Sequence, residues 1–238
     1  MDDLNFLKEE FEKVKVLREC ALNIAEARIK NIQLTVEYDR KDKDGLKNGS
    51  PFDTVKSRLK TFDSALEKLD RRGWERSAAG FEKMKDIAGI RIVTPFLRDV
   101  YEIRDTLKAQ IEKTKPKNAM RIVEVEDYIL DKPKPNGYRS LHILAEVKVS
   151  AAKGDKAVWV PVEIQIRTKA QDLWASIEHK LKYKNPHPSK DTEAKLADVA
   201  NYLCGFDEMI EHLRDENDEE ALGAEDIPDL SKLENFDL

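Results

Sequence analysis

The stretch VWVPVEIQIRT, Val158–Thr168, alternates apolar and polar residues over most of its length. Valine or isoleucine occupies every second position, and Glu163, Gln165 and Arg167 stand between them. Because successive side chains of a β-strand point to opposite faces, this pattern predicts a strand with one buried face and one polar face. Pro161 within the run indicates an edge strand or a bulge.

The rest of the chain supplies the other layers of such a sheet. Further strands are predicted for residues 55–59, 87–96, 119–129 and 138–149. Helices are predicted for residues 7–24, 61–73, 99–113, 169–183 and 192–213, where apolar residues recur every three or four positions. Residues 37–51 are polar, with two glycines and a proline, and predict a loop. We therefore expect an α+β (mixed α/β) fold, with a mixed sheet of about five strands flanked by helices and helical extensions at both ends.

Two of these helices carry apolar stripes with a predicted role. The stripe of the first helix consists of Leu7, Phe11, Val14, Leu17, Ala21 and Ile24. It is expected either to pack on its own domain or to form a contact between subunits. In the helix over 169–183 the predicted core side consists of Leu173, Trp174, Ile177 and Leu181.

Composition limits the class of protein. The 238 residues carry a net charge of -5 with 37% charged residues, so the two signs are interleaved. Cys20 and Cys204 are far apart, the N-terminus is acidic, and no apolar run reaches membrane-spanning length. We therefore expect a cytoplasmic protein without a membrane segment. An acidic chain argues against extensive duplex binding but leaves room for a local cationic pocket.

One cluster of cations surrounds the predicted strand-to-helix crossover near residue 60. Arg58 and Lys60 are two apart on a strand, and Lys60, Ser64 and Lys68 follow at intervals of four. Together with the N–H groups of a helix N-terminus, they would suit a polyphosphate. The alternative is a solvated helix face without a ligand.

Two carboxylates and an arginine lie in or beside predicted strands. Asp86 precedes the strand that contains Arg91, and Glu163 lies in the middle of another. If these strands are neighbours, Asp86 and Glu163 form a paired-carboxylate site suited to Mg²⁺, and one of them could accept a proton. The alternatives are an edge-strand Arg91 paired with a carboxylate and a Glu163 that faces water.

The stretch PKPNGYRSLH, Pro133–His142, places polar groups around an Asn-Gly turn. Tyr138 offers a ring on which a base could stack, and Lys134 and His142 offer groups for phosphates. Arg139 could contact the same phosphates or hold the loop. A core tyrosine after a turn is the alternative. The four histidines and two cysteines have no zinc-site spacing, and no glycine-rich phosphate loop occurs.

Taken in order, five motifs resemble the synthetase region of the RelA/SpoT family. They are RLKTFDSALEK, DIAGIRI, NGYRSLH, VEIQIRT and WASIEHKLKYK, and they span about residues 52–184. The short chain is similar to the stand-alone small alarmone synthetases. The resemblance implies a nucleotidyltransferase-like synthetase domain over 51–185, preceded by a helical segment and loop over 1–50. A C-terminal helix over 186–214 and an acidic tail over 215–238 complete the expected organisation.

The resemblance also implies an activity. Such enzymes are pyrophosphokinases that move the β,γ-pyrophosphate of ATP to the 3′-hydroxyl of GTP or GDP, which yields AMP and pppGpp or ppGpp. It implies an adenine sandwich by Arg58 and Arg91, and phosphate binding by Lys60, Ser64 and Lys68. It implies Mg²⁺ at Asp86, with Glu163 sharing the metal or activating the 3′-hydroxyl. On the acceptor side it implies guanine stacking by Tyr138, phosphate contacts from Lys134 and His142, and guanine reading by Asp172. A homotetramer is the implied assembly.

Two other hypotheses stay open from the sequence. The acceptor could instead be the 3′ end of a tRNA or an adenine nucleotide, because relatives that use these acceptors share the ATP-side motifs. A catalytically inactive nucleotide- or RNA-binding regulator would lack Asp86 or Glu163, and both residues are present.

Overall fold

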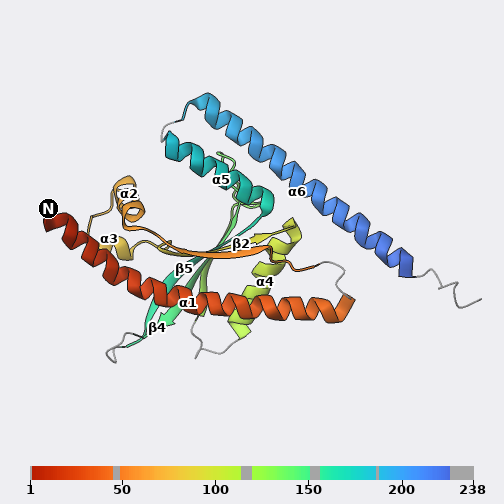
Figure 1. Ribbon diagram of the computed structural model, residues 1–238, viewed down its shortest axis with the longest axis horizontal. Helices are drawn as coiled ribbons and strands as arrows, with labels where there is room; N and C mark the ends of the chain where they lie inside the picture. The colour runs from red at the N-terminus through yellow and green to blue at the C-terminus, as the bar shows by residue number, and fades with distance from the viewer. Residues whose placement is uncertain (1, 45–48, 114–119, 151–155, 186–187, 226–238) are drawn as a thin grey trace, which may run out of the picture.

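A computed structural model describes residues 2–44, 49–113, 120–150, 156–185 and 188–225. Its elements lie in the order α1 (Asp2–Asp44), β1 (Thr54–Leu59), α2 (Phe62–Arg72), α3 (Ala78–Glu82), β2 (Ala88–Thr94), α4 (Leu97–Lys113), β3 (Met120–Asp127), β4 (Leu141–Val149), β5 (Val158–Thr168), α5 (Lys169–Lys184) and α6 (Lys190–Glu225). The five strands form one mixed sheet, which confirms the predicted fold class. Helix α1 runs along one side of this sheet, and α5 and α6 lie on the other side (Figure 1).

The strand order is β1-β2-β5-β4-β3, with β2 and β5 parallel and the other neighbours antiparallel. Strand β5 is therefore central, and the edge position that Pro161 suggested is wrong. The pairing with β2 begins only at Glu163, two residues after Pro161. Because β2 does not pair at Pro161, the missing N–H leaves no gap in that ladder, and the carbonyl oxygen of Pro161 accepts a hydrogen bond from Arg18 of α1 at 3.2 Å.

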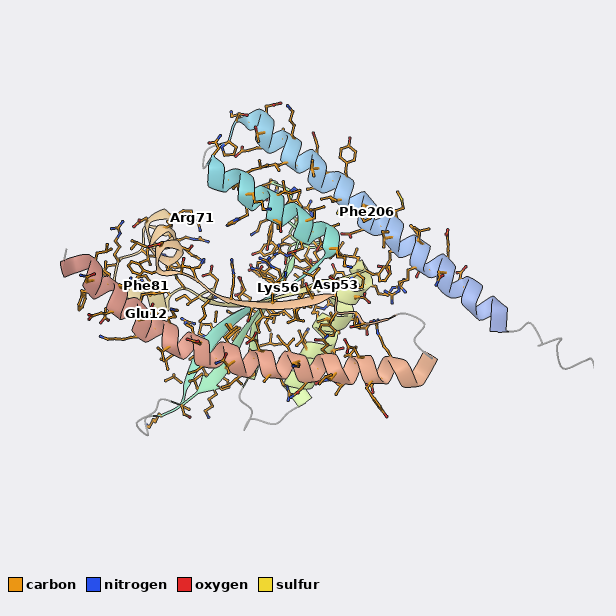
Figure 2. The ribbon with its side chains drawn as sticks, in the orientation of Figure 1. Glu12, Asp53, Lys56, Arg71, Phe81 and Phe206 are labelled. Carbon is orange, nitrogen blue, oxygen red and sulfur yellow. The ribbon has the colours of Figure 1, made fainter. Side chains whose placement is uncertain are left out.

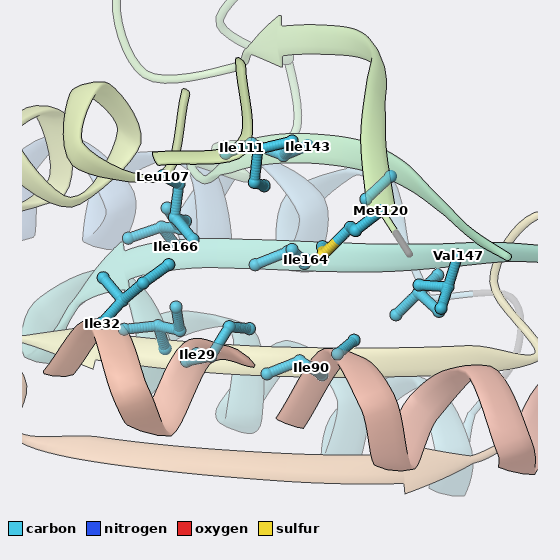
Figure 3. Packing of buried hydrophobic residues seen from close by; sticks show 14 of the residues in the cluster. Ile29, Ile32, Ile90, Leu107, Ile111, Met120, Ile143, Val147, Ile164 and Ile166 are labelled. Carbon is cyan, nitrogen blue, oxygen red and sulfur yellow. The ribbon is translucent and has the colours of Figure 1, made fainter. Parts of the chain in front are cut away.

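The apolar face of the sheet is covered by α1 and α4. Ile29 and Ile32 of α1 and Leu107 of α4 are buried against Ile90 and Ile164 of the central strands (Figure 3). The predicted N-terminal stripe points mostly into the protein. Its buried members are Phe11, Val14 and Ala21, its partly buried members are Leu7 and Leu17, and its last member, Ile24, is exposed. The structure thus supports the first of the two readings, a helix packed on its own domain.

A second apolar cluster joins the first half of α1 to α2 and α3. The ring of Phe11 contacts those of Phe62 and Phe81 edge-on, at centroid distances of 5.7 and 5.1 Å. Figure 2 shows Phe81 beside α1. Leu69 and Met84 are fully buried in the same cluster. This packing fixes α2 next to the start of β2, where several of the predicted site residues lie.

Helices α5 and α6 form an antiparallel pair over the other face of the sheet (Figure 1). The indole N–H of Trp174 donates to the carbonyl of Leu196 at 2.8 Å. Of the predicted core side of α5, Trp174 is buried, whereas Leu173, Ile177 and Leu181 are exposed. Those three predictions are wrong, because the side of α5 that packs against the protein is the one that carries Ala170 and Trp174.

Both terminal helices are longer than the sequence predicted. Helix α1 continues through residues 37–44, which were expected to form a loop, and Arg40 in this segment pairs with Asp99 and Glu102 of α4. Helix α6 continues past Leu213 to Glu225, so the start of the expected tail is helical. Residues 226–238 of that tail lie outside the described residues. The predicted division of the chain into residues 1–50, 51–185, 186–214 and 215–238 stays a prediction. None of the helices in the described ranges combines the length and apolarity that crossing a membrane requires.

Candidate active site

The polar face of the sheet carries the candidate site. A cavity of about 560 Å³ lies between this face and α5. Its lining includes Lys56, Arg58, Gly89, Arg91, Tyr138, Glu163, Gln165, Arg167, Ser176 and His179. Charged and polar side chains gather here because every second residue of β1, β2 and β5 points away from α1 and α4. A concave site of this size, lined by converging charges, suits a nucleotide better than an apolar ligand.

Glu163 lies at the centre of this face. In β5 it pairs with Gly89 of β2, which has no side chain to cover it. Gln165 donates to one of its carboxylate oxygens at 2.7 Å, and His142 Nδ1 lies 3.4 Å from the other. Burial raises the pKa of Glu163, but these two partners outweigh burial, so its pKa lies below the ordinary 4.5. The carboxylate is therefore ionised at neutral pH.

Asp86 lies three residues before Gly89, at the approach to β2. Lys68 of α2 lies 2.8 Å from one carboxylate oxygen, and Lys60 lies 3.3 Å from the other. Burial opposes ionisation, yet the two lysines lower the pKa of Asp86 below its ordinary value. The negative charge of Asp86 also acts on Glu163 and partly raises its pKa. The two carboxylates thus share one electrostatic environment, because their strands are neighbours as the sequence analysis required.

The crossover before α2 differs in detail from its prediction. Thr61 is the N-cap of α2, and its side chain accepts from the backbone N–H of Ser64. The hydroxyl of Ser64 is exposed and bonds to Thr61 at 3.1 Å. Lys60 precedes the helix, so it does not share a helix face with Ser64 and Lys68. The two lysines nevertheless converge, because both reach Asp86.

The turn at Asn136 and Gly137 lies within a longer loop between β3 and β4. Gly137 has a φ of 91°, and the Asn136 side chain accepts from the backbone N–H of Tyr138 at 3.2 Å. Arg139 donates to the carbonyls of Lys134 and Tyr138, so it holds the loop. This bears out the second reading of Arg139.

Three of the predicted acceptor residues, Lys134, Tyr138 and His142, form a contiguous group, and Tyr138 lines the cavity. The Tyr138 hydroxyl lies 2.8 Å from His142 Nε2. The ammonium group of Lys134 lies over the ring of Tyr128 at 4.0 Å and over that of Tyr138 at 5.0 Å. Since His142 also contacts Glu163, this group adjoins the central carboxylate.

Three arginines, Arg58, Arg91 and Arg167, line the cavity from the adjacent strands β1, β2 and β5. Arg91 is not on an edge strand, because β2 lies between β1 and β5. Its Nη1 lies 3.4 Å from Asp172 Oδ1, and Arg167 Nε lies 2.9 Å from the same oxygen. Asp172, the predicted guanine reader, is thus shared by two arginines from two strands.

Seven of the eleven predicted site residues line the cavity or contact its lining, namely Arg58, Arg91, Lys134, Tyr138, His142, Glu163 and Asp172. Asp86, Lys60 and Lys68 form a second group, which the charge of Asp86 links to Glu163. Ser64 contacts neither group. Sequence reasoning assigned no site role to Gln165, Arg167 or Tyr128. For Gln165 and Arg167 the sequence held a signal, because they alternate with the core residues of β5 and so lie on the same face as Glu163. Tyr128 follows the end of β3 and had no comparable signal.

Comparison with known proteins supplies an independent observation. The sequence profile of a region found in RelA / SpoT proteins matches residues 57–188, more than half of the chain. The chain belongs to the RelA/SpoT family. The resemblance carried by the five motifs is thereby confirmed.

Among individual RelA/SpoT relatives, the chain is 37% identical over 208 residues to GTP pyrophosphokinase YwaC of Bacillus subtilis, covering 85% of this chain and 91% of the relative. It is 31% identical over 217 residues to GTP pyrophosphokinase YjbM of the same organism, covering 91% and 92%. The crystal structure of the small alarmone synthetase 1 from Bacillus subtilis bound to its product pppGpp superimposes with a TM-score of 0.73 at 30% identity, covering 87% of this chain and 98% of that one.

Proposed function

We propose that this chain is a GTP/GDP pyrophosphokinase, which transfers the β,γ-pyrophosphate of ATP to the 3′-hydroxyl of GTP or GDP and releases AMP. The products are pppGpp and ppGpp. The observation that carries the proposal is that Arg58, Arg91, Tyr138 and Glu163 line one cavity, in which Glu163 and Arg91 project from neighbouring strands. The names of the two relatives and the product bound to the related structure support the same reaction.

On the donor side, Arg58 and Arg91 hold the adenine. They project from neighbouring strands, with Arg58 paired to Gly89 and Arg91 two residues further along β2. Planar guanidinium groups stack on aromatic rings, and the absence of a side chain at Gly89 leaves space beside them. Lys60 and Lys68 bind the triphosphate. Ser64 completes this set through its exposed hydroxyl.

On the acceptor side, the ring of Tyr138 stacks on guanine, and Lys134 and His142 contact the phosphates. Glu163 accepts the proton of the 3′-hydroxyl as that oxygen attacks the β-phosphorus. This role suits its lowered pKa, because an ionised carboxylate can take a proton while Gln165 and His142 hold its orientation. Positioning and charge neutralisation then supply most of the catalysis, as is general for phosphoryl transfer.

Mg²⁺ is the proposed cofactor, and Asp86 and Glu163 would hold it. The donor set fits, since both groups are ionised carboxylates and the charge of Asp86 acts on Glu163. No cluster of three or more His, Cys, Asp or Glu side chains suited to a metal occurs among the described residues. Mg²⁺ would therefore take its other ligands from phosphate and water oxygens, which is its usual habit. When bound, the ion would offset the negative charge that builds up on the transferred group.

A direct assay tests the proposal. The protein is incubated with Mg²⁺, labelled ATP and one acceptor at a time, namely GTP, GDP, ATP alone or deacylated tRNA, and the products are separated by anion-exchange chromatography. We expect label in pppGpp and ppGpp with the guanosine acceptors and none with the other two. Binding of ATP without any guanosine product would refute the proposal, and label on tRNA with GTP inert would replace its acceptor.

We further propose a homo-oligomer, with a homotetramer as the expected form, in the cytoplasm. The outer face of α6 carries an apolar stripe at intervals of three and four residues, and Figure 2 shows Phe206 of this stripe on α6. Its members are the exposed residues Val199, Tyr202, Phe206, Met209 and Leu213. Such spacing suits a helix–helix seam. A monomeric mass for the wild type in multi-angle light scattering would refute the assembly.

The proposed cytoplasmic location is supported by the two cysteines. The unpaired Cys20 and Cys204 agree with a reducing compartment.

A further inference from the structure

Tyr128 lies at the start of the loop between β3 and β4, beside three of the proposed acceptor residues. The ammonium group of Lys134 lies over its ring, 4.0 Å from the centroid. The ring of His142 meets it edge-on at a centroid distance of 5.1 Å, and the ring of Tyr138 does so at 6.4 Å. One partly buried side chain, to which the proposed reaction assigns no role, therefore lies against all three groups.

The backbone that carries Tyr128 is fixed from both sides. Its N–H donates to the carbonyl of Ser140 at 3.0 Å, which closes the loop at its base. The preceding residue, Asp127, is nearly buried, and its carboxylate accepts from the hydroxyl of Tyr101 in α4 at 3.1 Å. The ring of Tyr128 is therefore a rigid support, whereas Lys134 extends from the loop on a long, flexible stem.

The way in which Lys134 is held leaves its charge available. No carboxylate of the described residues lies within ion-pair distance of its ammonium group, which is attracted instead to the ring faces of Tyr128 and Tyr138. A carboxylate partner would neutralise the lysine and compete with a phosphate, whereas a neutral ring does neither. Burial and the neighbouring carboxylate of Glu126 raise the pKa of Tyr128 to about 12, so its side chain stays neutral at physiological pH.

We infer that Tyr128 is a positioning residue for the acceptor nucleotide, whose ring face holds the ammonium group of Lys134 in place for the acceptor's phosphates. This inference rests on the proposed function. A lysine that is already ordered loses less rotamer freedom when a phosphate binds, and this strengthens binding of the acceptor. Tyr128 needs no contact of its own with the nucleotide. Its effect therefore depends on Lys134 and is absent from ATP binding.

The test compares Tyr128→Leu, which removes the ring, with Tyr128→Phe, which keeps it. KM for GTP is measured from initial rates at saturating ATP, and KM for ATP at saturating GTP. We expect Tyr128→Leu to raise KM for GTP about fivefold, as for loss of one partly desolvated cation–π contact, and to leave KM for ATP within about twofold of the wild type. Tyr128→Phe is expected to stay within about twofold in both.

A double-mutant cycle separates this role from a merely structural one. Both substitutions at Tyr128 are repeated together with Lys134→Met, which removes the ammonium group. In that background Tyr128→Leu is expected to raise KM for GTP by less than about twofold, because its effect passes through the lysine. A ring that only filled space would cost the same in both backgrounds.

Tyr38→Leu is the matched control, because Tyr38 is 64% exposed on α1, on the other side of the sheet (Figure 1). It is expected to match the wild type in both KM values. If Tyr128→Leu fails to fold by circular dichroism, 3,4,5-trifluorophenylalanine at position 128 carries the test. Fluorine weakens the attraction of the ring face for a cation while the ring keeps its shape, so KM for GTP is expected to exceed that of Tyr128→Phe at least about threefold.

Three results overturn the inference. They are a KM for GTP within twofold of the wild type once the ring is removed or fluorinated, an equal rise in KM for ATP, and a full fivefold effect of Tyr128→Leu in the Lys134→Met background. If the wild type itself makes no guanosine product, the proposed function has failed, and the inference fails with it.

Discussion

Asp207 of α6 lies where the helix meets the β5–α5 junction, and replacing it with asparagine is expected to stabilise the protein. Its carboxylate is 6% exposed and accepts hydrogen bonds from Thr168 Oγ1 at 2.7 Å and from Gln171 Nε2 at 3.5 Å. Burial raises the pKa of Asp207 from 3.8 to about 6, against the effect of these two donors and with a contribution from the negative charge of Glu211. Both bonds end on Oδ2, and an asparagine oxygen can accept them without a charge.

The sign and size of the effect follow from this pKa. A raised carboxyl pKa means that the folded state binds the proton more tightly, so ionisation destabilises it. The penalty is absent below pH 3.8, grows as pH rises, and is complete above about pH 6. A shift of about two units corresponds to about 3 kcal/mol above that pH, and to about half of this at pH 5.

Urea unfolding of the wild type and Asp207→Asn at pH 8 and pH 5 measures the difference. We expect the variant to be more stable by up to about 3 kcal/mol at pH 8, with the gain falling by about half at pH 5. Asp198→Asn, an exposed carboxylate on the same helix, should change stability by less than about 0.5 kcal/mol at either pH. A variant less stable than the wild type at pH 8 would show that the ionised carboxylate stabilises the junction, and the reasoning would be refuted.

Three other predictions concern the loop, the catalytic carboxylate and the anchor of α1. Gly137→Ala should lower the unfolding free energy by at least about 2 kcal/mol, since a Cβ there would lie 2.4 Å from Ala200 Cβ at a φ of 91°; an unchanged urea midpoint would contradict this. Glu163→Gln should slow pyrophosphate transfer at least about 100-fold with an unchanged melting temperature, and near-normal turnover would remove its role. Arg18→Met should cost about 2–4 kcal/mol in urea, because the buried guanidinium donates to the carbonyls of Pro161 and Glu82; a loss below about 0.5 kcal/mol would argue against this anchor.

Much of the fold follows from local patterns that the sequence displays directly. The alternation in β5 identified both the buried face and the face that carries Glu163. Pro161 led to the wrong prediction of an edge strand, because a proline has no backbone N–H to donate to a neighbouring strand. Strand β2 starts to pair only beyond it, and Arg18, 143 residues away, takes its carbonyl. Such a long-range partner leaves no mark in the local sequence.

The helices show the same limit. Residues 37–44 are polar, and their helix is held by an ion pair from Arg40 to Asp99, a residue of α4 that is only 1% exposed. Arg214 of α6 reaches the same carboxylate at 3.2 Å, which ties the second half of α6 to the domain. Helical periodicity is recognised from apolar stripes. It therefore did not predict the helix over residues 37–44 or the second half of α6, which are held by ion pairs. Periodicity also could not tell that Leu173, Ile177 and Leu181 face outward, because an exposed apolar stripe has the same spacing as a buried one.

For the candidate site, the sequence order placed most of the carboxylates and cations on the right elements, with Lys60 as an exception, but it did not predict which of them pair. Nothing in the spacing indicated that Lys60 and Lys68 converge on Asp86, or that Asp172 meets Arg91. Both pairings depend on how α2 and α5 are docked, and that docking is set by the aromatic cluster around Phe81 and by the junction with α6.

The most direct test of the central claim follows both parts of the ATP molecule during one reaction with GTP and Mg²⁺. ATP labelled in the γ-phosphate and separately in the adenine is used, and the products are quantified together. The account predicts AMP and γ-labelled pppGpp in equal amounts for the wild type. It predicts that both products form at least about 100-fold more slowly with the Glu163→Gln variant, and that neither forms when the metal is chelated. Formation of ADP with labelled orthophosphate, and no labelled guanosine product, would contradict it.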